Sequence, residues 1–131
     1  MRIVGGYHHV HLTSPDPEAA AAWYVRMLGA EIYADAPLRG SRNLRLKVGE
    51  ALLYIRAPRA TDAPRPAGGQ RFFGMDHVCF AVEGTEEMLA HVVKNGGVIA
   101  DPLFDLPGGS RGAYLQAPDG VLVELFEPKK D

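Results

Sequence analysis

The chain has 131 residues, of which 47% are hydrophobic, and it can therefore bury one core in a single compact unit or in two tightly joined halves. Its 14 Lys and Arg residues are spread among 16 Asp and Glu residues, which excludes the concentrated basic stripe of a nucleic-acid-binding protein. A small-molecule substrate is the partner we expect.

No run approaches the roughly 20 apolar residues that span a bilayer, and no apolar signal-peptide core opens the chain, so we expect no membrane partner and a cytoplasmic location.

The first half of the chain begins with a strand-like run at residues 7–12. The turn that follows contains Asp16, a plausible helix cap, and Pro17, which suits the first helical position. These residues predict a helix over residues 19–28, and Gly29 ends it. Three β-rich runs come next, at residues 31–33, 44–48 and 51–56.

The second half repeats this order of elements. A strand-like run at residues 75–80 precedes Thr85, a predicted cap for a helix over residues 86–94, which Gly96 and Gly97 end. Strands are predicted at residues 98–100, 113–116 and 121–126. Cys79, the single cysteine, is interpreted as a buried small hydrophobe, and because it cannot form an internal disulfide it agrees with a reducing cytoplasm.

An internal repeat relates the two halves. His77 follows His9 by 68 residues, as Gly97 follows Gly29, and the final strands align at a spacing of 70. The sequence therefore predicts an α+β fold of two β-α-β-β-β modules, residues 1–56 and 75–131. Residues 57–74, rich in Pro, Gly, Ala and Arg, form a linker or a loop that covers the site. One module leaves a sheet edge and a sheet face uncovered, so the modules are expected to pair within one chain or between two chains.

Three residues of this repeat are candidate metal ligands. Strand alternation places His9 and His11 on one face, and the repeat selects His9, because His9 matches His77 whereas His11 matches Cys79. Glu124 interrupts an apolar strand, where an unpaired carboxylate is costly to bury. Two imidazoles and a carboxylate are a common ligand set for divalent iron, zinc, manganese or nickel. Taken singly, each His is more often an ordinary structural residue, and an Arg partner for Glu124 is the alternative to a metal.

Motifs along nearly the whole chain support this interpretation. They comprise His9-Val10, Asp16, Ala20, Trp23-Tyr24 and Leu28-Gly29 in the first half, and Asp76-His77-Val78, residues 94–97, Pro118-Asp119-Gly120 and Glu124-Leu125 in the second. In these residues the chain resembles the vicinal oxygen chelate superfamily of glyoxalases, bleomycin-resistance proteins and extradiol dioxygenases. The resemblance implies a curved mixed sheet around one divalent ion (Fe, Ni, Zn, Mn or Co), held by His9, His77 and Glu124, and a homodimer.

The resemblance also implies several functions. A metal-dependent glyoxalase-like lyase or isomerase, acting on a small substrate with vicinal oxygens, is the first. An Fe(II)-dependent extradiol-type dioxygenase is the second, and a fosfomycin- or bleomycin-resistance-type protein is the third. In the last strand of the first module, glyoxalase I-type lyases carry a fourth ligand, usually Glu, and the related acyl-CoA epimerases carry Gln. This chain has Tyr54 there. A phenol with a pKa of about 10 is a poor ligand for zinc or nickel at neutral pH, which argues against a methylglyoxal lyase.

Further residues are candidates for handling protons and substrate. Tyr54 and Tyr114 are predicted to bond to substrate oxygens beside Glu124, and aromatic packing is the alternative for both. Arg111, in a predicted flexible loop, is a candidate contact for an anionic substrate group, or else a solvated side chain. Phe72 and Phe73 in the linker are expected to close over the site or to cover the edge of the core.

Overall fold

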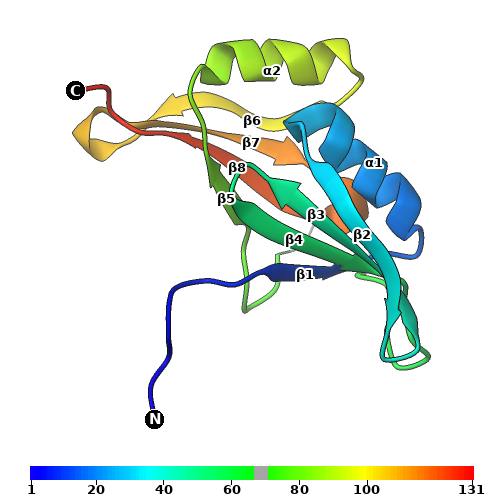
Figure 1. Cartoon of the computed structure of the whole chain (residues 1–131). Helices are drawn as coiled ribbons and strands as arrows, with labels where there is room; N and C mark the ends of the chain where they lie inside the picture. The colour runs from blue at the N-terminus through cyan, green and yellow to red at the C-terminus, as the bar shows by residue number, and fades with distance from the viewer. Residues whose placement is uncertain (67–70) are drawn as a thin grey trace. The chain divides into compact units, whose positions relative to one another are not determined.

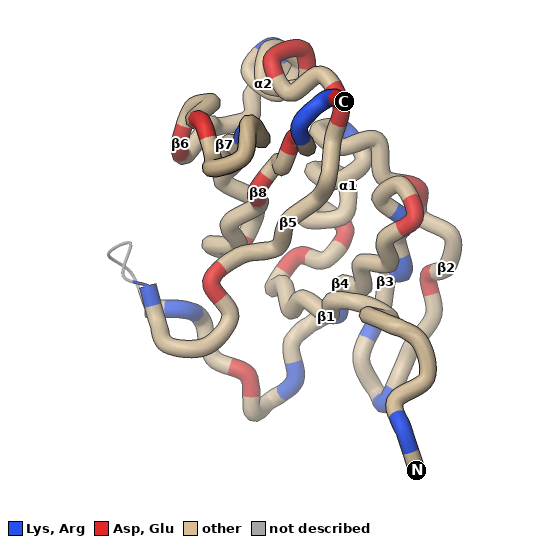
Figure 2. The backbone as a smooth tube through the Cα atoms, turned by 90° about the vertical axis from the view of Figure 1, so that its left-hand side faces the viewer, with Lys and Arg blue, Asp and Glu red and all other residues tan. Residues whose placement is uncertain are grey.

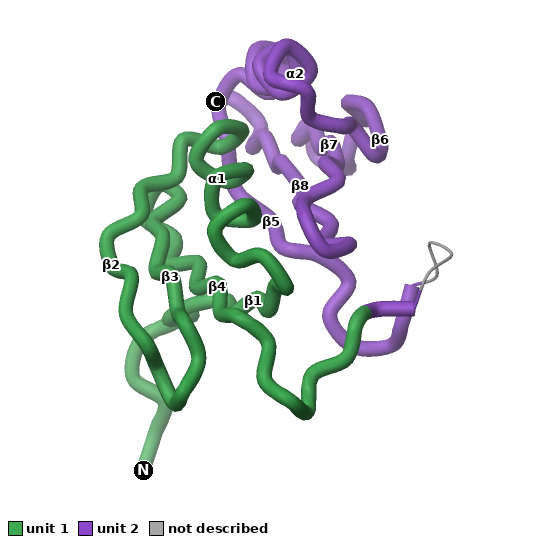
Figure 3. The backbone as a smooth tube through the Cα atoms, turned by 90° about the vertical axis from the view of Figure 1, so that its right-hand side faces the viewer, with its two compact units in different colours: residues 1–64 green, residues 65–131 purple. Residues whose placement is uncertain are grey.

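The structure, a computed structural model, describes residues 1–66 and 71–131. Residues 67–70, part of the predicted linker, lie outside the described residues. The chain divides into two compact units, Met1–Pro64 (unit 1) and Arg65–Asp131 (unit 2), which Figure 3 distinguishes by colour and which are described one at a time. The boundary between them falls within the 57–74 segment.

Unit 1 is a four-stranded mixed sheet with one helix (Figure 1). Its elements are β1 (Val10–Thr13), α1 (Pro17–Leu28), β2 (Glu31–Leu38), β3 (Ser41–Val48) and β4 (Ala51–Arg56). The strand order is β1-β4-β3-β2, with β1 parallel to β4 and the other pairs antiparallel.

Unit 2 repeats this topology. Its elements are β5 (Val78–Ala81), α2 (Thr85–Lys94), β6 (Val98–Asp105), the 3-10 turn η1 (Pro107–Gly109), β7 (Arg111–Gln116), the 3-10 turn η2 (Pro118–Gly120) and β8 (Leu122–Glu127). The order is β5-β8-β7-β6, with β5 parallel to β8. The predicted pair of β-α-β-β-β modules is confirmed.

Strand alternation sorts the side chains of each sheet into two sets. The set that packs with the helix forms the core and is fully or nearly buried: Leu44, Leu46, Leu53 and Ile55 in unit 1, and Ala113, Leu115, Val123 and Leu125 in unit 2. The other set lies on the face that we call the helix-free face of each sheet. All of the candidate site residues on strands except Arg111 belong to helix-free faces or extend them.

The ends of α1 follow the prediction. The Asp16 carboxylate accepts a hydrogen bond from the Ala19 backbone N–H, Pro17 begins the helix, and Gly29 ends it in the left-handed conformation at φ 68°. The predicted Thr85 cap of α2 is wrong. Gly84, at φ 73°, caps the helix, while Thr85 is its first residue and is fully buried, so its side chain does not cap the backbone.

Strands β2 and β6 are longer than predicted. Each lies at the edge of its sheet and contains a proline, Pro37 or Pro102, which an edge strand tolerates because one side of its backbone needs no ladder partner. Figure 2 shows basic and acidic positions in both units, in agreement with the charge spread seen in the sequence. Neither helix in the described part of the chain is long and apolar enough to cross a membrane.

Candidate metal centre

Unit 2 brings two of the three predicted ligands together. His77 directly precedes β5, and β5 pairs in parallel with β8 so that Cys79 lies beside Glu124. Nε2 of His77 lies 2.8 Å from Oε2 of Glu124, and their side chains are 27% and 12% exposed. The nitrogen and the oxygen of the two candidate ligands are therefore adjacent at a position that solvent still reaches.

Asp76 fixes the orientation of the His77 ring. Its Oδ2 lies 2.7 Å from Nδ1 of His77, and its Oδ1 accepts a hydrogen bond of 2.5 Å from the Arg71 guanidinium. Arg71 and then His77 lower the pKa of Asp76. A carboxylate on Nδ1 leaves Nε2, the atom that faces Glu124, for a metal. Asp76 was predicted only as part of a family motif, although an acid directly before a candidate ligand His is visible in the sequence.

Tyr114 borders this pair. It is the register partner of Glu124 on β7, its ring meets the His77 ring edge to face at 5.2 Å, and it stacks on Phe104 at 5.8 Å. Burial raises the pKa of Tyr114, and the charge of Glu124 raises it further, so the phenol stays protonated and can donate a hydrogen bond. The predicted position beside the ligand strand is observed.

Cys79 corrects one interpretation. The thiol is exposed rather than buried, because Cys79 lies on the helix-free face of β5 next to Glu124. Burial of part of the side chain and the neighbouring Glu124 charge raise the pKa of Cys79 to about 11, so the thiol stays protonated at neutral pH.

Unit 1 carries the matching positions on its own helix-free face. His9 stacks on Tyr54 at a centroid distance of 4.2 Å, and His11 meets the same ring at 5.7 Å, so the predicted shared side of His9 and His11 is confirmed. Tyr54 pairs with His11 as Glu124 pairs with Cys79, which makes Tyr54 the counterpart of Glu124 in the repeat. The Tyr54 hydroxyl is 3.2 Å from the Tyr33 hydroxyl, which donates to it.

The donor set of unit 2 suits a divalent ion. Two ligand atoms that bind one ion at about 2.1 Å and at a right angle lie roughly 3 Å apart, close to the separation of Nε2 and Oε2 in this pair. Gly112 leaves room for the carboxylate, since a Cβ there would lie 3.2 Å from Oε1 of Glu124. Within residues 1–66 and 71–131, however, no three His, Cys, Asp or Glu side chains are grouped to hold an ion.

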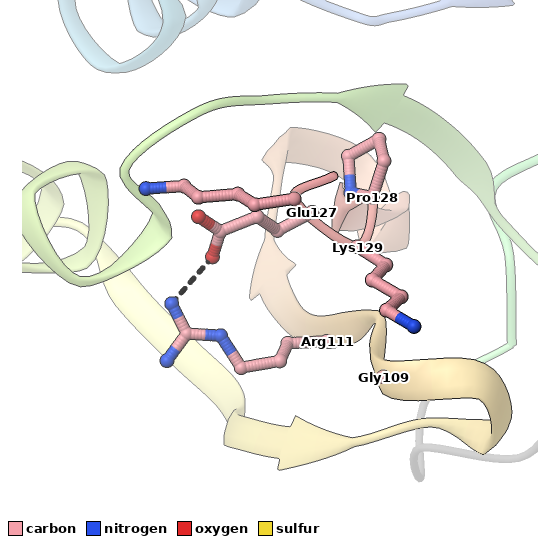
Figure 4. A pocket seen from close by; sticks show the side chains of 6 residues that line it. Gly109, Arg111, Glu127, Pro128 and Lys129 are labelled. Carbon is pink, nitrogen blue, oxygen red and sulfur yellow. Dashed lines mark hydrogen bonds and ion pairs between the residues drawn. The ribbon is translucent and has the colours of Figure 1, made fainter.

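Arg111 lies at the start of β7 rather than in a flexible loop. Its guanidinium donates to Oε2 of Glu127 at 2.6 Å and to Oε1 of Glu86 at 2.9 Å. Figure 4 shows the ion pair with Glu127 at the wall of a pocket of about 290 Å³, which is lined by Gly109, Arg111, Glu127, Pro128, Lys129 and Lys130. The two carboxylates compensate the Arg111 charge, and its contact with substrate remains a prediction.

Phe72 and Phe73 both lie exposed in unit 2. The closure of Phe72 and Phe73 over the candidate site stays a prediction.

Comparison with known proteins places the chain in a family. Residues 6–125 match the Glyoxalase/Bleomycin resistance protein/Dioxygenase superfamily. Human mitochondrial methylmalonyl-CoA epimerase is 29% identical over 131 residues, covering 93% of this chain and 73% of the epimerase. A glyoxalase family protein from Enterococcus faecalis is 29% identical with a TM-score of 0.76, covering 93% of this chain and 97% of that one.

A third similar structure is a mutant fosfomycin resistance protein, FosX, from Listeria monocytogenes, crystallised with Mn(II) and 1S,2S-dihydroxypropylphosphonic acid. It is 18% identical with a TM-score of 0.70, covers 94% of this chain and 92% of that one, and so shares the fold. From the profile match, the paired modules and these neighbours, the chain belongs to the glyoxalase, bleomycin-resistance and dioxygenase superfamily.

Proposed function

We propose that the chain is a metal-dependent lyase or isomerase that acts on a small substrate with two neighbouring oxygens. The observation that carries the proposal is the 2.8 Å approach of Nε2 of His77 to Oε2 of Glu124, with Asp76 on the other ring nitrogen. As the third ligand we propose His9, the counterpart of His77 in the repeat, supplied either by the same chain or by the partner in a homodimer.

A divalent ion held there would supply Lewis acidity to the two substrate oxygens. Tyr114 then serves as a hydrogen-bond donor toward substrate, because its pKa is raised and its ring contacts the rings of His77 and Phe104. Glu124 and Tyr114 are register partners on neighbouring strands, which makes them our candidates for handling a proton. Tyr54 is the candidate on unit 1, where Tyr33 and His9 fix its ring.

Isomerisation is the more strongly supported branch of this proposal. Human methylmalonyl-CoA epimerase aligns with 93% of this chain, and a second epimerase, from Cereibacter sphaeroides, is 32% identical over 90 residues. An epimerisation removes a proton from one carbon and returns a proton to the opposite face of the same carbon. It requires no oxidant. The substrate we favour is therefore an acid or thioester with an acidic C–H beside a carbonyl.

A ring-cleaving dioxygenase that uses Fe(II) is the second candidate, and Tyr54 favours it. Tyr54 occupies the repeat position of Glu124, but its hydroxyl accepts from Tyr33 and its ring stacks on His9. Such a phenol is a poor fourth ligand, and a three-ligand set leaves more positions open for substrate and oxygen.

Reconstitution with single metals separates these candidates. The full chain is loaded anaerobically with Mn, Co, Ni, Zn or Fe(II) and assayed for deuterium exchange into methylmalonyl-CoA by mass spectrometry, and for oxygen uptake with catechols. Exchange that requires metal and is lost in His77→Ala supports the proposal. The control, His91→Ala, removes an exposed imidazole on α2 of the same unit and should retain activity. Oxygen uptake with iron and no exchange would favour the dioxygenase instead.

A further inference from the structure

The helix-free face of unit 1 carries an excess of hydrogen-bond donors. Asn43 and Arg45 occupy successive positions of β3 on this face. Asn43 pairs in register with Arg56 of β4, and Arg45 pairs with Tyr54. Lys47 follows two residues further along, exposed to solvent. Of these three cations, Lys47 lies opposite Glu31 of β2 and Arg56 is paired with Asp62, which leaves Arg45.

Arg45 is half-buried, and its positive charge is uncompensated. Its guanidinium carbon lies 5.3 Å from the centre of the Tyr54 ring, a cation–π arrangement that holds the side chain over the sheet. In the part of the chain that the structure describes, no carboxylate forms an ion pair with Arg45. Arg56 on the same face differs, because Asp62 accepts two hydrogen bonds from it. Arg45 therefore retains its planar set of donors for a ligand.

The side-chain amide of Asn43 has a buried donor with no acceptor among the described residues, which is an observation independent of Arg45. The residue is 1% exposed, and its Oδ1 accepts a hydrogen bond of 2.9 Å from Nε2 of His11. Its Nδ2 is buried and has no hydrogen-bond partner among residues 1–66 and 71–131. A buried amide donor left without an acceptor is costly, and a ligand that offers one removes the cost. The hydrogen bond from His11 holds the Asn43 amide in this orientation, so a ligand must displace the covering side chains to reach Nδ2.

We propose that Arg45 and Asn43, on β3 of unit 1, bind a small oxyanion, a carboxylate or a phosphate. Both residues present donors, whereas carboxylate and phosphate oxygens only accept, and guanidinium matches either group with two parallel hydrogen bonds. Asn43 and Arg45 are two positions apart on β3, so they lie on the same face of the sheet, roughly 7 Å apart along the strand. A carboxylate or phosphate together with the group attached to it is long enough to contact both.

Calorimetric titration of the full chain with inorganic phosphate and with malonate, each with and without added Mn(II), tests the site directly. Arg45→Gln should weaken binding of the preferred anion at least tenfold, and Arg45→Lys should fall between, since Lys keeps the charge but loses the planar fork. Arg39→Gln is the matched control. It removes the same charge from the β2–β3 turn, roughly 15 Å or more along the strand and beyond the Debye length of about 8 Å in physiological salt. It should leave the affinity within twofold.

The ratio of the two affinities tells which anion the site prefers. Equal affinities in wild type and Arg45→Gln, or equal losses in Arg45→Gln and Arg39→Gln, would overturn the inference, and so would the absence of binding by either anion. Circular dichroism and thermal unfolding of each variant check that it is folded. Binding without Mn(II) needs no metal centre and no turnover, so failure of the proposed reaction and failure of the anion site are distinguishable.

Discussion

Gly112 on β7 leaves space for the side chains of the proposed metal site. A Cβ added there would lie 2.7 Å and 2.9 Å from Cζ and Cε2 of the Phe104 ring and 3.2 Å from Oε1 of Glu124. Carbon atoms pack best at about 3.5 to 4.0 Å, so the ring must move by most of an ångström and the carboxylate by a few tenths. Gly112→Ala therefore disturbs Glu124 through a direct contact.

The size of the effect follows from what can move. Cζ and Cε2 are at the far end of the half-buried Phe104 side chain, which can shift at low cost. We therefore expect a destabilisation at the low end of the range for overpacking, about 1 kcal/mol. At 25 °C that energy corresponds to roughly a fivefold change in an equilibrium constant. We expect a loss of this size in the free energy of unfolding, and at least a fivefold loss of affinity for Mn(II) or Zn(II).

Two assays and one control test this prediction. Urea denaturation measures the free energy of unfolding, and competition with a chelator measures metal affinity. Ala113→Gly on the neighbouring, fully buried position faces the core, so it should lower stability by about 1 kcal/mol or more and leave metal affinity unchanged. The reasoning is refuted if Gly112→Ala binds metal like the wild type, or if Ala113→Gly weakens metal binding equally.

Three further substitutions probe other parts of the account. Leu125→Ala removes a fully buried side chain of β8 and should lower the free energy of unfolding by about 2 to 5 kcal/mol in urea denaturation; a loss below about 1 kcal/mol would contradict the assigned core. Arg56 holds the pKa of Asp62 well below its usual range, so the native carboxylate stabilises the fold above the unfolded pKa of about 3.9, and this is lost as the pH falls through the lower native pKa. Asp62→Asn should thus lower the urea midpoint near neutral pH, with a difference from wild type that shrinks below about pH 4; a difference that grows in acid would reverse the sign. Asp76→Asn should weaken chelator-measured metal affinity about 10- to 100-fold, because the carboxylate no longer orients His77, and an unchanged affinity would remove Asp76 from the site.

The repeat made most of the fold predictable from the sequence. Equal spacing of His9 and His77 and of Gly29 and Gly97 located corresponding strands and helix ends, and the register of Tyr54 and Glu124 agrees with the final-strand alignment. Local chemistry was sufficient for the ends of α1, because caps and left-handed glycines act within a few residues, but not for the start of α2, where Gly84 is the cap in place of Thr85.

What the sequence did not predict depends on the position of a strand in its sheet. Strands β2 and β6 were predicted too short because each contains a proline, Pro37 or Pro102, which argues against a strand. A proline is acceptable in an edge strand, but the sequence does not show which strands lie at the edge of a sheet. Bulges near Ile32 and Ile99 further interrupt the alternation that identifies strands. Exposure of Cys79 likewise depends on which face the helix covers.

The candidate site was predictable as a list of residues but not as a set of contacts. His77 and Glu124 were identified from repeat position and from an acid in an apolar strand, whereas their separation required the parallel pairing of β5 with β8. The ion pairs of Arg111 with Glu86 and Glu127 join residues from three elements, which no local pattern indicates.

Elemental analysis of the purified chain after reconstitution measures directly whether the chain holds a divalent metal. We expect about one equivalent of a divalent metal per chain, lost in His9→Ala, His77→Ala and Glu124→Ala and retained in His91→Ala. The absence of bound metal with all of Fe, Ni, Zn, Mn and Co, or retention by Glu124→Ala equal to that of the wild type, would contradict this expectation.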